Sequence, residues 1–313
     1  MTELILHDAI KQRLAWPDLI EQLRTWFKDG AVSAPDRQVL NIEQPDGSTS
    51  SVLIMPAWMP GEAIGVKVVT FFPQNAAIGQ PTINAGYMAF DGQTGRLTAV
   101  MDGDALTARR TAAASALAAS YLARTDARTL LVVGTGQLSI EVASAHAAVR
   151  SYDKVLVWGR SEEKAAALAS EMQADGLPAI AVQDLEAACA KSDVITTVTA
   201  STRPVVHGSW LTPGTHLDLI GAFREDMREC DDAAMAQADI FVDTRTGAIK
   251  AGDLYQPITD GVLSSTDIVA DLTELCRGEH RGRRDAFGYT VFKSVGLALE
   301  DLAAASLVLS SSK

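Results

Sequence analysis

The chain has 313 residues, which suggests two domains at the usual size of roughly 150 residues each. It is 47% hydrophobic and 21% charged, as in an ordinary globular protein. With 27 Lys and Arg against 39 Asp and Glu, the formal net charge is −12, and so acidic a surface repels phosphate backbones and anionic lipid. Composition therefore argues against nucleic-acid and membrane partners and favours an enzyme that acts on small molecules.

The cysteines and the N-terminus indicate the compartment. Cys189, Cys230 and Cys276 lie far apart without a Cys-x-x-Cys pair, so we expect no disulfide framework and no metal site. The first residues include the acidic Glu3 where a signal peptide carries basic residues. The longest apolar stretch, Ala112 to Ala123, is shorter than the roughly 20 residues that span a bilayer. We expect a cytoplasmic protein.

The first hundred residues predict a mixed α+β segment with hairpins. A helical pattern covers Ile10 to Phe27. Short apolar runs then alternate with turn signals such as Pro45-Asp46-Gly47, as in a sheet of hairpins. The expected strands are Val39–Ile42, Ser51–Met55, Ile64–Phe72 and Ala85–Asp91.

From Gly103 onward the pattern changes to a long alanine-rich helix, Ala105 to Ala123, followed by alternating strands and helices. Such alternation implies βαβ units, hence an α/β fold with a Rossmann-type, doubly wound parallel sheet. The expected strands are Leu130–Gly134, Lys154–Trp158, Ile180–Val182, Asp193–Val198, His216–Ile220 and Ile240–Asp243. The expected helices are Leu138–Val149, Glu162–Gln173, Leu185–Ala190 and, at the end, Val291–Leu309. We therefore predict a first domain of residues 1–123 joined by a C-terminal helix within 290–313, and a Rossmann domain of residues 124–289.

A glycine-rich turn follows the first strand of the predicted parallel sheet. Gly134-x-Gly136-x-x-Ser139 stands between a strand and a helix, with a second strand downstream, which is the context that a dinucleotide-binding fingerprint requires. The first glycine permits the tight turn, and the second lets the backbone approach a pyrophosphate at the helix N-terminus. Ser139 is small enough for close helix–strand packing. The motif predicts dinucleotide binding.

The end of the second strand favours NADP over NAD. An NAD site places an acidic residue there to bind the ribose 2′-hydroxyl, whereas this chain reads Trp158-Gly159-Arg160-Ser161. Arg160 can pair with a 2′-phosphate and Ser161 can donate to it; the alternative is that Arg160 is a surface arginine or helix-start residue. We predict NADP, with NAD as the alternative.

Three cations are candidates for binding an anionic substrate. Lys67 interrupts an apolar strand, either on a solvent-facing side or aimed into a cleft. Arg109 and Arg110 lie about 100° apart at the start of a helix, so at most one faces a neighbouring domain. Arg37 follows a proline turn and could be a plain loop charge. Arginine clamps a carboxylate through two parallel hydrogen bonds, but the sequence does not establish that these residues converge.

Several motifs together resemble the ornithine cyclodeaminase/mu-crystallin family over nearly the whole chain. They are Leu106-Thr-Ala-Arg-Arg-Thr-Ala-Ala, Val133-Gly-Thr-Gly-Gln, Trp210-Leu-Thr-Pro-Gly-Thr, Gly221-Ala-Phe-Arg-Glu-Asp-Met-Arg-Glu229 and Lys293-Ser-Val-Gly-Leu-Ala-Leu-Glu-Asp301. The resemblance implies a Rossmann domain and a second domain, built from both chain ends, that also forms a homodimer. It further implies that the substrate carboxylate is held by Arg37, Lys67 and Arg110, with Thr82 beside the substrate. By the same resemblance the cofactor is held by Gly134, Thr135, Gly136, Gln137, Arg160 and Ser161, with Thr199 and Val295 near its nicotinamide end.

Two departures from the family separate the possible activities. The cyclodeaminase branch carries a glutamate before its Met-Pro pair and a catalytic aspartate after its Gly-Gly pair, where this chain has Leu53 and Phe223. Neither can transfer a proton, and Asp226 could act only if its loop turned it inward.

We therefore expect an NAD(P)-dependent reductase of a small imino acid, such as pyrroline- or piperideine-2-carboxylate, with Lys67 and Asp226 as candidate catalytic residues. The alternatives are ornithine cyclodeaminase, an alanine dehydrogenase-like enzyme, and a non-catalytic NADP-regulated binding protein of the crystallin type.

Overall fold

The computed structural model describes residues 2–311, which form two compact units, each with its own sheet. The first unit comprises the described residues up to Thr111 and from Gly296 onward, and the second is Ala112–Val295. The sequence placed the first boundary at 123, but the division lies inside helix α3 (Gly103–Leu122). The start of α3 is bound to the first unit, where Arg109 donates to the Leu14 carbonyl, whereas Ala119 belongs to a core of the second.

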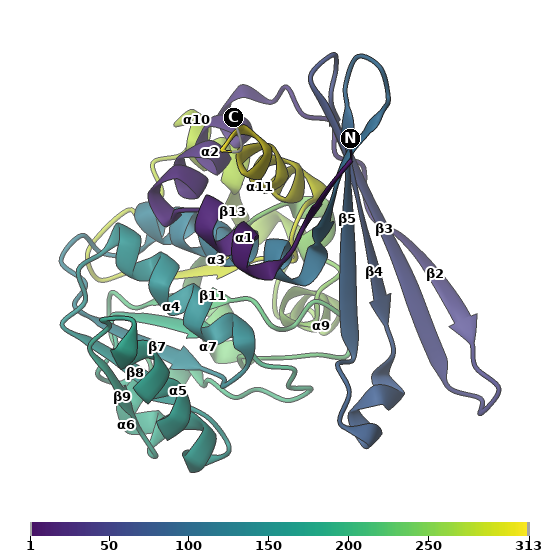
Figure 1. The fold of residues 1–313 in the computed structure, drawn as a ribbon. Coiled ribbons are helices and arrows are strands. Elements are labelled where there is room, and N and C mark those ends of the chain that lie inside the picture. The colour runs from purple at the N-terminus through teal and green to yellow at the C-terminus, as the bar shows by residue number, and fades with distance from the viewer. Residues whose placement is uncertain (1, 312–313) are drawn as a thin grey trace. The chain divides into compact units, whose positions relative to one another are not determined.

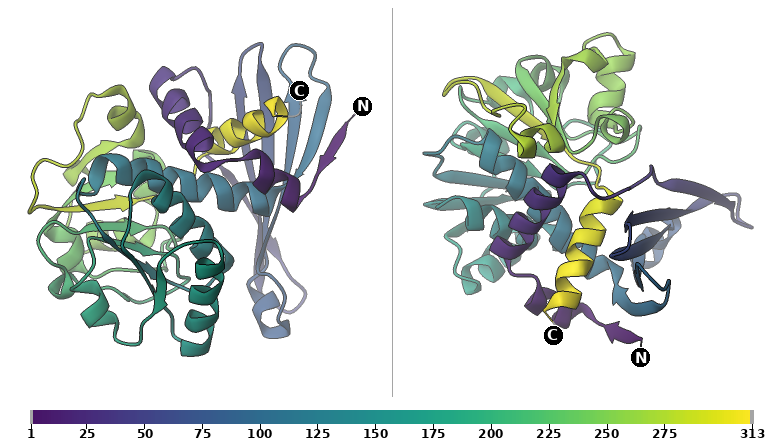
Figure 2. Two further views of the ribbon diagram at one scale, coloured as in Figure 1. Left: turned by 60° about the vertical axis from the view of Figure 1, so that its left-hand side comes forward. Right: turned by 90° about the horizontal axis from the view of Figure 1, so that it is seen from above.

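The first unit is a six-stranded sheet with helices packed on it (Figure 1). In the order β1-β6-β5-β4-β3-β2, the strands β2 to β6 form an antiparallel meander, and β1 pairs with β6 in parallel. Helix α11 lies between α2 and strands β3 and β4 (Figure 2), and its Leu302 packs on Met55 and Ala57. The elements are β1 (Glu3–Ile5), α1 (His7–Arg13), α2 (Trp16–Asp29), β2 (Gln38–Glu43), β3 (Thr49–Met59), β4 (Ala63–Phe71), η1 (Pro73–Ile78), β5 (Ile83–Asp91), β6 (Leu97–Asp102), the start of α3, and α11 (Ala298–Ser310). The predicted α+β character is confirmed.

The helical pattern over Ile10 to Phe27 is divided in the structure into α1 and α2. Between them the backbone leaves the helical conformation at Leu14 and Ala15, and Pro17 stands in the first turn of α2. Proline lacks the N–H that a continuing helix would need, but it fits the first turn of a new one. The prediction of one continuous helix was therefore wrong.

The second unit is an eight-stranded parallel sheet with helices on both faces. Its elements are the end of α3, β7 (Thr129–Val133), α4 (Gln137–Val149), β8 (Lys154–Trp158), α5 (Glu162–Ala174), β9 (Ala179–Ala181), α6 (Leu185–Cys189), β10 (Val194–Thr197), η2 (Gly208–Trp210), β11 (His216–Leu219), α7 (Asp232–Ala236), β12 (Ala238–Val242), α8 (Arg245–Ala248), α9 (Gly252–Thr259), η3 (Ser265–Asp267), β13 (Ile268–Asp271), α10 (Leu272–Arg277) and β14 (Tyr289–Lys293). Among the described residues, no helix of either unit is long and apolar enough to cross a membrane.

The strand order is β13-β12-β14-β11-β10-β7-β8-β9, in which the run from β9 to β11 is the doubly wound order with its reversal between β7 and β10. Side chains of β7 alternate between two cores. Leu130 and Val132 face α3, α4 and α5, whereas Leu131 and Val133 face α6 to α9. Burial on both faces explains why these strands read as continuous apolar runs. The predicted Rossmann-type fold is confirmed.

The helix predicted over Val291 to Leu309 is a strand followed by a helix. Val291 and Phe292 lie in β14, which is buried between β11 and β12, and α11 begins only at Ala298. Between them Gly296 adopts a φ of +78°, a conformation that favours glycine. A short apolar run is compatible with a buried strand or a buried helix, and here the pairing partners decide.

Candidate active site

The turn after β7 has the geometry that the glycine motif predicts. Gly134 has a φ of +137°, and a Cβ there would lie 2.8 Å from the Val198 carbonyl oxygen. Gly136 is the N-cap of α4 and has no side-chain cap, and a Cβ on it would meet only open space. The Ser139 N–H donates to the Gly136 carbonyl at 3.0 Å, which leaves the Gln137 and Leu138 N–H groups at the start of α4 to meet an anion. Ser139 is fully buried under this turn, as its packing role requires.

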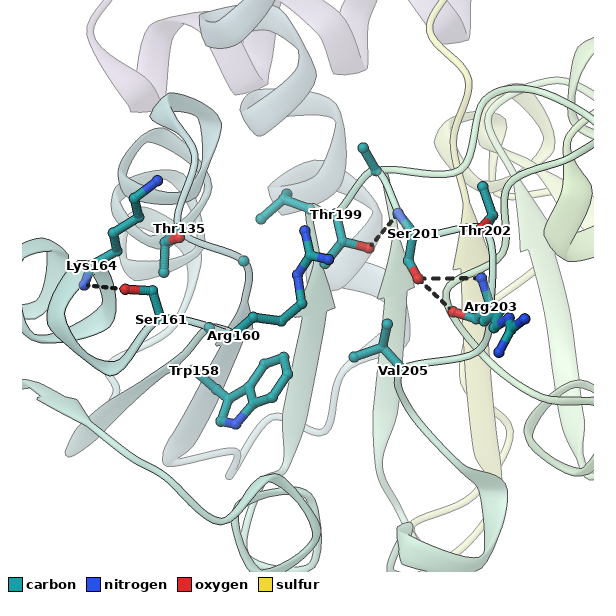
Figure 3. A pocket seen from close by; sticks show the side chains of 14 residues that line it. Thr135, Trp158, Arg160, Ser161, Lys164, Thr199, Ser201, Thr202, Arg203 and Val205 are labelled. Atoms are coloured by element: carbon teal, nitrogen blue, oxygen red, sulfur yellow. Dashed lines mark hydrogen bonds between the residues drawn. The ribbon is translucent and has the colours of Figure 1, made fainter. Parts of the chain in front are cut away.

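A cavity of about 520 Å³ opens beside this turn, at the carboxyl ends of β7, β8 and β10. In Figure 3 the Arg160 side chain extends into the cavity above Trp158 and toward Thr199. Within the described residues its guanidinium has no hydrogen-bond or ion-pair partner, so it can meet an anionic ligand. The cavity is lined by Gly134, Thr135, Trp158, Gly159, Arg160, Ser161, Lys164, Val198, Thr199, Ala200, Ser201, Thr202, Arg203 and Val205.

Most of the predicted cofactor residues gather at this cavity, including Gly134, Thr135, Arg160, Ser161 and Thr199. The Ser161 hydroxyl oxygen accepts the Lys164 N–H at 3.3 Å as the N-cap of α5, so its proton remains available to donate. Gly136 and Gln137 are exposed where α4 begins, and neither lines the cavity. Val295 lies after β14, and its N–H donates to the Asp243 carboxylate at 2.7 Å.

The cations predicted to hold a carboxylate lie together in the first unit. Lys67 on β4 donates from Nζ to Asp301 Oδ1 at 2.7 Å, and Arg110 on α3 donates from Nε to the same oxygen at 2.9 Å. Arg110 Nη1 donates to Glu300 Oε2 at 2.6 Å. These bonds leave Arg110 Nη2 and two ammonium protons of Lys67 unused by the two acids. One carboxylate on α11 thus aligns both cations.

Arg37 joins this group through Gly296, whose carbonyl oxygen accepts from Arg37 Nη2 at 2.8 Å. A Cβ on Gly296 would lie 2.1 Å from Arg110 Nη1, so only glycine permits this close approach. The sequence left open whether Arg37, Lys67 and Arg110 converge. In the structure all three are tied to one short segment, Gly296 to Asp301.

Burial makes the charges of this group interdependent. Burial lowers the pKa of Lys67 to about 8; the Arg110 and Arg37 charges act in the same direction, and Asp301 opposes them. Burial also disfavours the charged form of Tyr87 and so raises its pKa. The Tyr87 hydroxyl is enclosed and has no hydrogen-bond partner among the described residues. Lys67 is 1% exposed, so of the two placements that the sequence allowed, the solvent-facing one is wrong.

Arg109 is also buried, at 9% exposure, and not on the solvent side. Its guanidinium lies 3.5 Å from the centre of the Trp16 ring and donates to the Leu14 carbonyl. The helical offset correctly predicted that Arg109 and Arg110 face different sides of α3. It did not reveal that Arg109 is covered by Trp16 at the start of α2.

The structure does not bring Thr82 or Asp226 to these groups. Thr82 precedes β5, and its carbonyl accepts the Phe72 N–H at 2.8 Å, just after β4. Phe72 is five residues from Lys67 along this extended segment, which is roughly 16 Å. Asp226 is 55% exposed and forms a two-pronged ion pair with Arg224. In this arrangement the Asp226 carboxylate is not turned inward.

Sequence reasoning assigned no role to three buried acids that organise the two groups. Glu300 and Asp301 interrupt an otherwise apolar helix, a signal that could have exposed them. Glu229, fully buried, accepts hydrogen bonds from the loops after β10 and β11. No local pattern distinguishes Glu229 from the exposed acids around it.

Comparison with known proteins shows the family of this chain. The sequence profile of the ornithine cyclodeaminase/mu-crystallin family matches residues 5–313. The chain belongs to this family. It is 39% identical over 300 residues to the Delta(1)-pyrroline-2-carboxylate reductase of Paracoccus denitrificans, with 95% of this chain and 92% of that protein covered.

Two solved structures are similar over nearly the whole chain. The Delta(1)-pyrroline-2-carboxylate reductase of Thermococcus litoralis, in complex with NADH and L-proline, has a TM-score of 0.94 at 32% identity, covering 99% of this chain and 97% of that one. An archaeal alanine dehydrogenase dimer with bound NAD has a TM-score of 0.91 at 29% identity, covering 99% and 96%. The family predicted from the motifs is confirmed.

Proposed function

We propose that this protein is an NAD(P)-dependent reductase that converts a small cyclic imino acid, such as pyrroline-2-carboxylate, into the corresponding amino acid. The observation that carries this proposal is a buried pair of cations, Lys67 and Arg110, aligned by Asp301, in a chain that also has a cavity beside a glycine-rich turn. The resemblance to two pyrroline-2-carboxylate reductases supports the same reaction.

In this proposal Arg110 and Lys67 bind the substrate carboxylate through the N–H groups that Asp301 and Glu300 leave unused. Arg37, anchored on Gly296, adds a third positive charge. Fixing the carboxylate orients the C=N carbon, and orientation supplies much of the rate. The bound dinucleotide would supply the hydride. Since the imine is protonated from solution, the protein does not have to supply a proton donor for this step. The first unit is then the substrate domain and the second the cofactor domain.

We further propose that the preferred cofactor is NADP. No acid stands at the end of β8 to hold a 2′-hydroxyl, and Arg160 extends into the cavity without a protein partner. Ser161 adds a hydroxyl donor at the start of α5. A 2′-phosphate is the anion that this combination would recognise.

Ornithine cyclodeamination is the main alternative, and it needs a base within hydrogen-bond reach of the amine. Leu53 and Phe223 occupy the positions where the cyclodeaminase branch has acids, and Asp226 is paired with Arg224. The arrangement therefore favours the reductase. An alanine dehydrogenase-like reaction and cofactor-dependent ligand binding without turnover would use the same cation group, and kinetics separate them.

The decisive experiment follows NADPH and NADH absorbance with pyrroline-2-carboxylate, with pyruvate plus ammonia, and with no substrate. We expect steady oxidation with the cyclic imino acid, faster with NADPH. Ammonia release from ornithine and NAD at an equal or higher rate would establish the cyclodeaminase instead. Oxidation with pyruvate and ammonia alone would indicate the alanine dehydrogenase, and stoichiometric binding without turnover a binding protein.

We also propose a cytoplasmic homodimer. Strand β2 is exposed along its whole length and presents Val39, Leu40 and Ile42, an apolar edge that a second copy would cover. The similar archaeal alanine dehydrogenase is a dimer. All three cysteines are free, as a reducing compartment requires. Light scattering should give twice the chain mass, and Leu40→Lys should shift the protein to monomer.

A further inference from the structure

Glu229 connects the two loops that follow β10 and β11. Its Oε1 accepts the Thr199 N–H at 2.7 Å and the Thr199 hydroxyl at 2.8 Å, while Oε2 accepts the Gly221 N–H at 2.6 Å and the Ala222 N–H at 3.3 Å. Its own backbone is held in turn, because the Glu229 N–H donates to Asp253 Oδ1 at 2.8 Å. One side chain therefore sets the positions of both loops.

These bonds favour an ionised Glu229. Three of the four donors are backbone N–H groups, which can only donate and therefore stabilise a carboxylate more than a neutral carboxyl. Burial and the Asp253 charge raise the pKa of Glu229, whereas the Lys293 charge and the bonds from Thr199 act against that. The four donors compensate for the water that the carboxylate has lost.

A second acid and a lysine are buried close to Glu229. Lys293 Nζ lies 3.2 Å from Asp253 Oδ2, and the side chains of Glu229, Asp253 and Lys293 are all 0% exposed. Lys293 is ion-paired with Asp253, and its charge also acts on Glu229. The Glu229 carboxylate contacts Thr199, which lines the cofactor cavity, so a negative charge on Glu229 lies directly behind the cavity wall.

We propose that the Glu229 carboxylate makes the site bind the oxidised, cationic form of the nicotinamide more tightly relative to the reduced form, and so favours hydride donation. This inference rests on the proposed function, in which the nicotinamide lies at the carboxyl ends of these strands. In that reaction a C–H bond of the reduced ring breaks and its hydride forms a C–H bond at the iminium carbon. The neutral ring becomes a cation while the iminium nitrogen becomes a neutral amine. A fixed negative charge favours the side of this exchange on which the ring is positive.

Glu229→Gln tests the charge, because it keeps the shape of the side chain and removes the charge. Dissociation constants for NADP+ and NADPH are measured by quenching of tryptophan fluorescence, since Trp158 lines the cavity. NADP+ and NADPH should both bind less tightly, because the new amide group carries N–H donors where the carboxylate oxygen accepted from the backbone, and the two loops lose part of their support. We expect the ratio of the NADP+ constant to the NADPH constant to rise about tenfold, equivalent to about 30 mV for a two-electron couple.

Asp193→Asn is the matched control. Asp193 precedes the same strand, β10, at its opposite end, and it likewise accepts backbone N–H groups, from Arg128 at 2.7 Å and Thr129 at 2.9 Å. Removing this charge should destabilise the fold but leave the ratio of the two constants within about twofold, because the charge lies a full strand length, roughly 13 Å, farther away.

Glu229→Asp keeps the charge and loses part of the hydrogen bonding, and it serves if the glutamine variant does not fold. It should weaken both cofactor forms together and leave their ratio within about twofold. An unchanged ratio in Glu229→Gln, or a tenfold shift in Glu229→Asp, would show that Glu229 only supports the loops and would overturn the inference. Failure of the wild-type protein to bind either form would instead contradict the proposed function.

Discussion

The cation group of the first unit and the cavity of the second, which we propose bind a substrate carboxylate and a dinucleotide, differ in how their cations are held. In the first, Lys67 and Arg110 are almost fully buried and already paired with Asp301 and Glu300. In the second, Arg160 is exposed in the cavity and has no partner among the described residues. A buried cation needs a permanent counter-charge to exist without its ligand, whereas a solvated one does not.

This difference has a functional consequence. A paired and buried cation is pre-organised, so its removal should damage both catalysis and folding. A solvated arginine contributes only when the ligand is present, so its removal should affect affinity alone. The following predictions test that contrast, from the largest expected effect to the smallest.

Arg110→Ala should have the largest effect. It removes a donor to the proposed substrate carboxylate and leaves Glu300 and Asp301 with less compensation in a buried setting. We expect kcat/KM to fall by at least about a thousandfold and the free energy of unfolding to fall by about 3–5 kcal/mol. Kinetics and urea unfolding measure the two effects, and NADPH titration provides the control, because the cofactor cavity is intact. A variant with wild-type kcat/KM would remove Arg110 from the site.

Arg160→Ala should weaken NADPH binding by about ten- to a hundredfold and leave NADH nearly unchanged, since one charge-assisted contact contributes about 1.5–3 kcal/mol. Its unfolding free energy should stay within about 0.5 kcal/mol of wild type. Fluorescence titration of both cofactors checks the prediction. Arg203→Ala, in the same cavity, is the comparison: a larger loss of NADPH there than in Arg160→Ala would move the phosphate site to Arg203.

Arg109→Ala sharpens the comparison from the structural side. Its guanidinium stacks on Trp16 and donates to the Leu14 carbonyl. We expect the unfolding free energy to fall by about 1–3 kcal/mol with kcat/KM within about threefold of wild type. Arg109→Lys keeps the charge without the planar fork and should recover part of the stability. A kinetic loss as severe as that of Arg110→Ala would mean that both arginines serve the substrate.

The smallest expected effect is a pH dependence of stability from Lys67. Its pKa is lowered from 10.5 to about 8, so the folded chain binds fewer protons than the unfolded chain between these values. The Lys67 contribution to stability therefore increases as the pH rises from about 8 toward 10.5. Between pH 8 and 9.5 we expect the wild type to gain about 1 kcal/mol or more relative to Lys67→Met. Parallel stability curves for the two proteins would contradict the lowered pKa.

Local patterns along the chain were sufficient to predict the fold and the turn geometry of the second unit. The strand of β7, the glycines Gly134 and Gly136, and the start of α4 are adjacent in sequence, and their backbone requirements are local. Arg160 and Ser161 come shortly after β8, and the structure places both at the same cavity, while their role in cofactor preference stays a prediction. The cation group was only half predicted: the motifs implied Lys67, Arg110 and Arg37, but their convergence depends on α11, more than 180 residues farther along the chain.

What the sequence by itself determined is therefore the family, the Rossmann-type α/β fold and the glycine-rich cofactor turn, because each depends on residue spacing within a few turns or strands. The tertiary structure alone decided that Val291 and Phe292 form a central strand, that Arg109 is covered by Trp16, and that Asp301 and Glu229 hold the two groups in place. A buried charge is tolerated only where other chain segments supply its partners, and even where a buried acid such as Asp301 interrupts an apolar helix, the local sequence does not say which distant cation it pairs with.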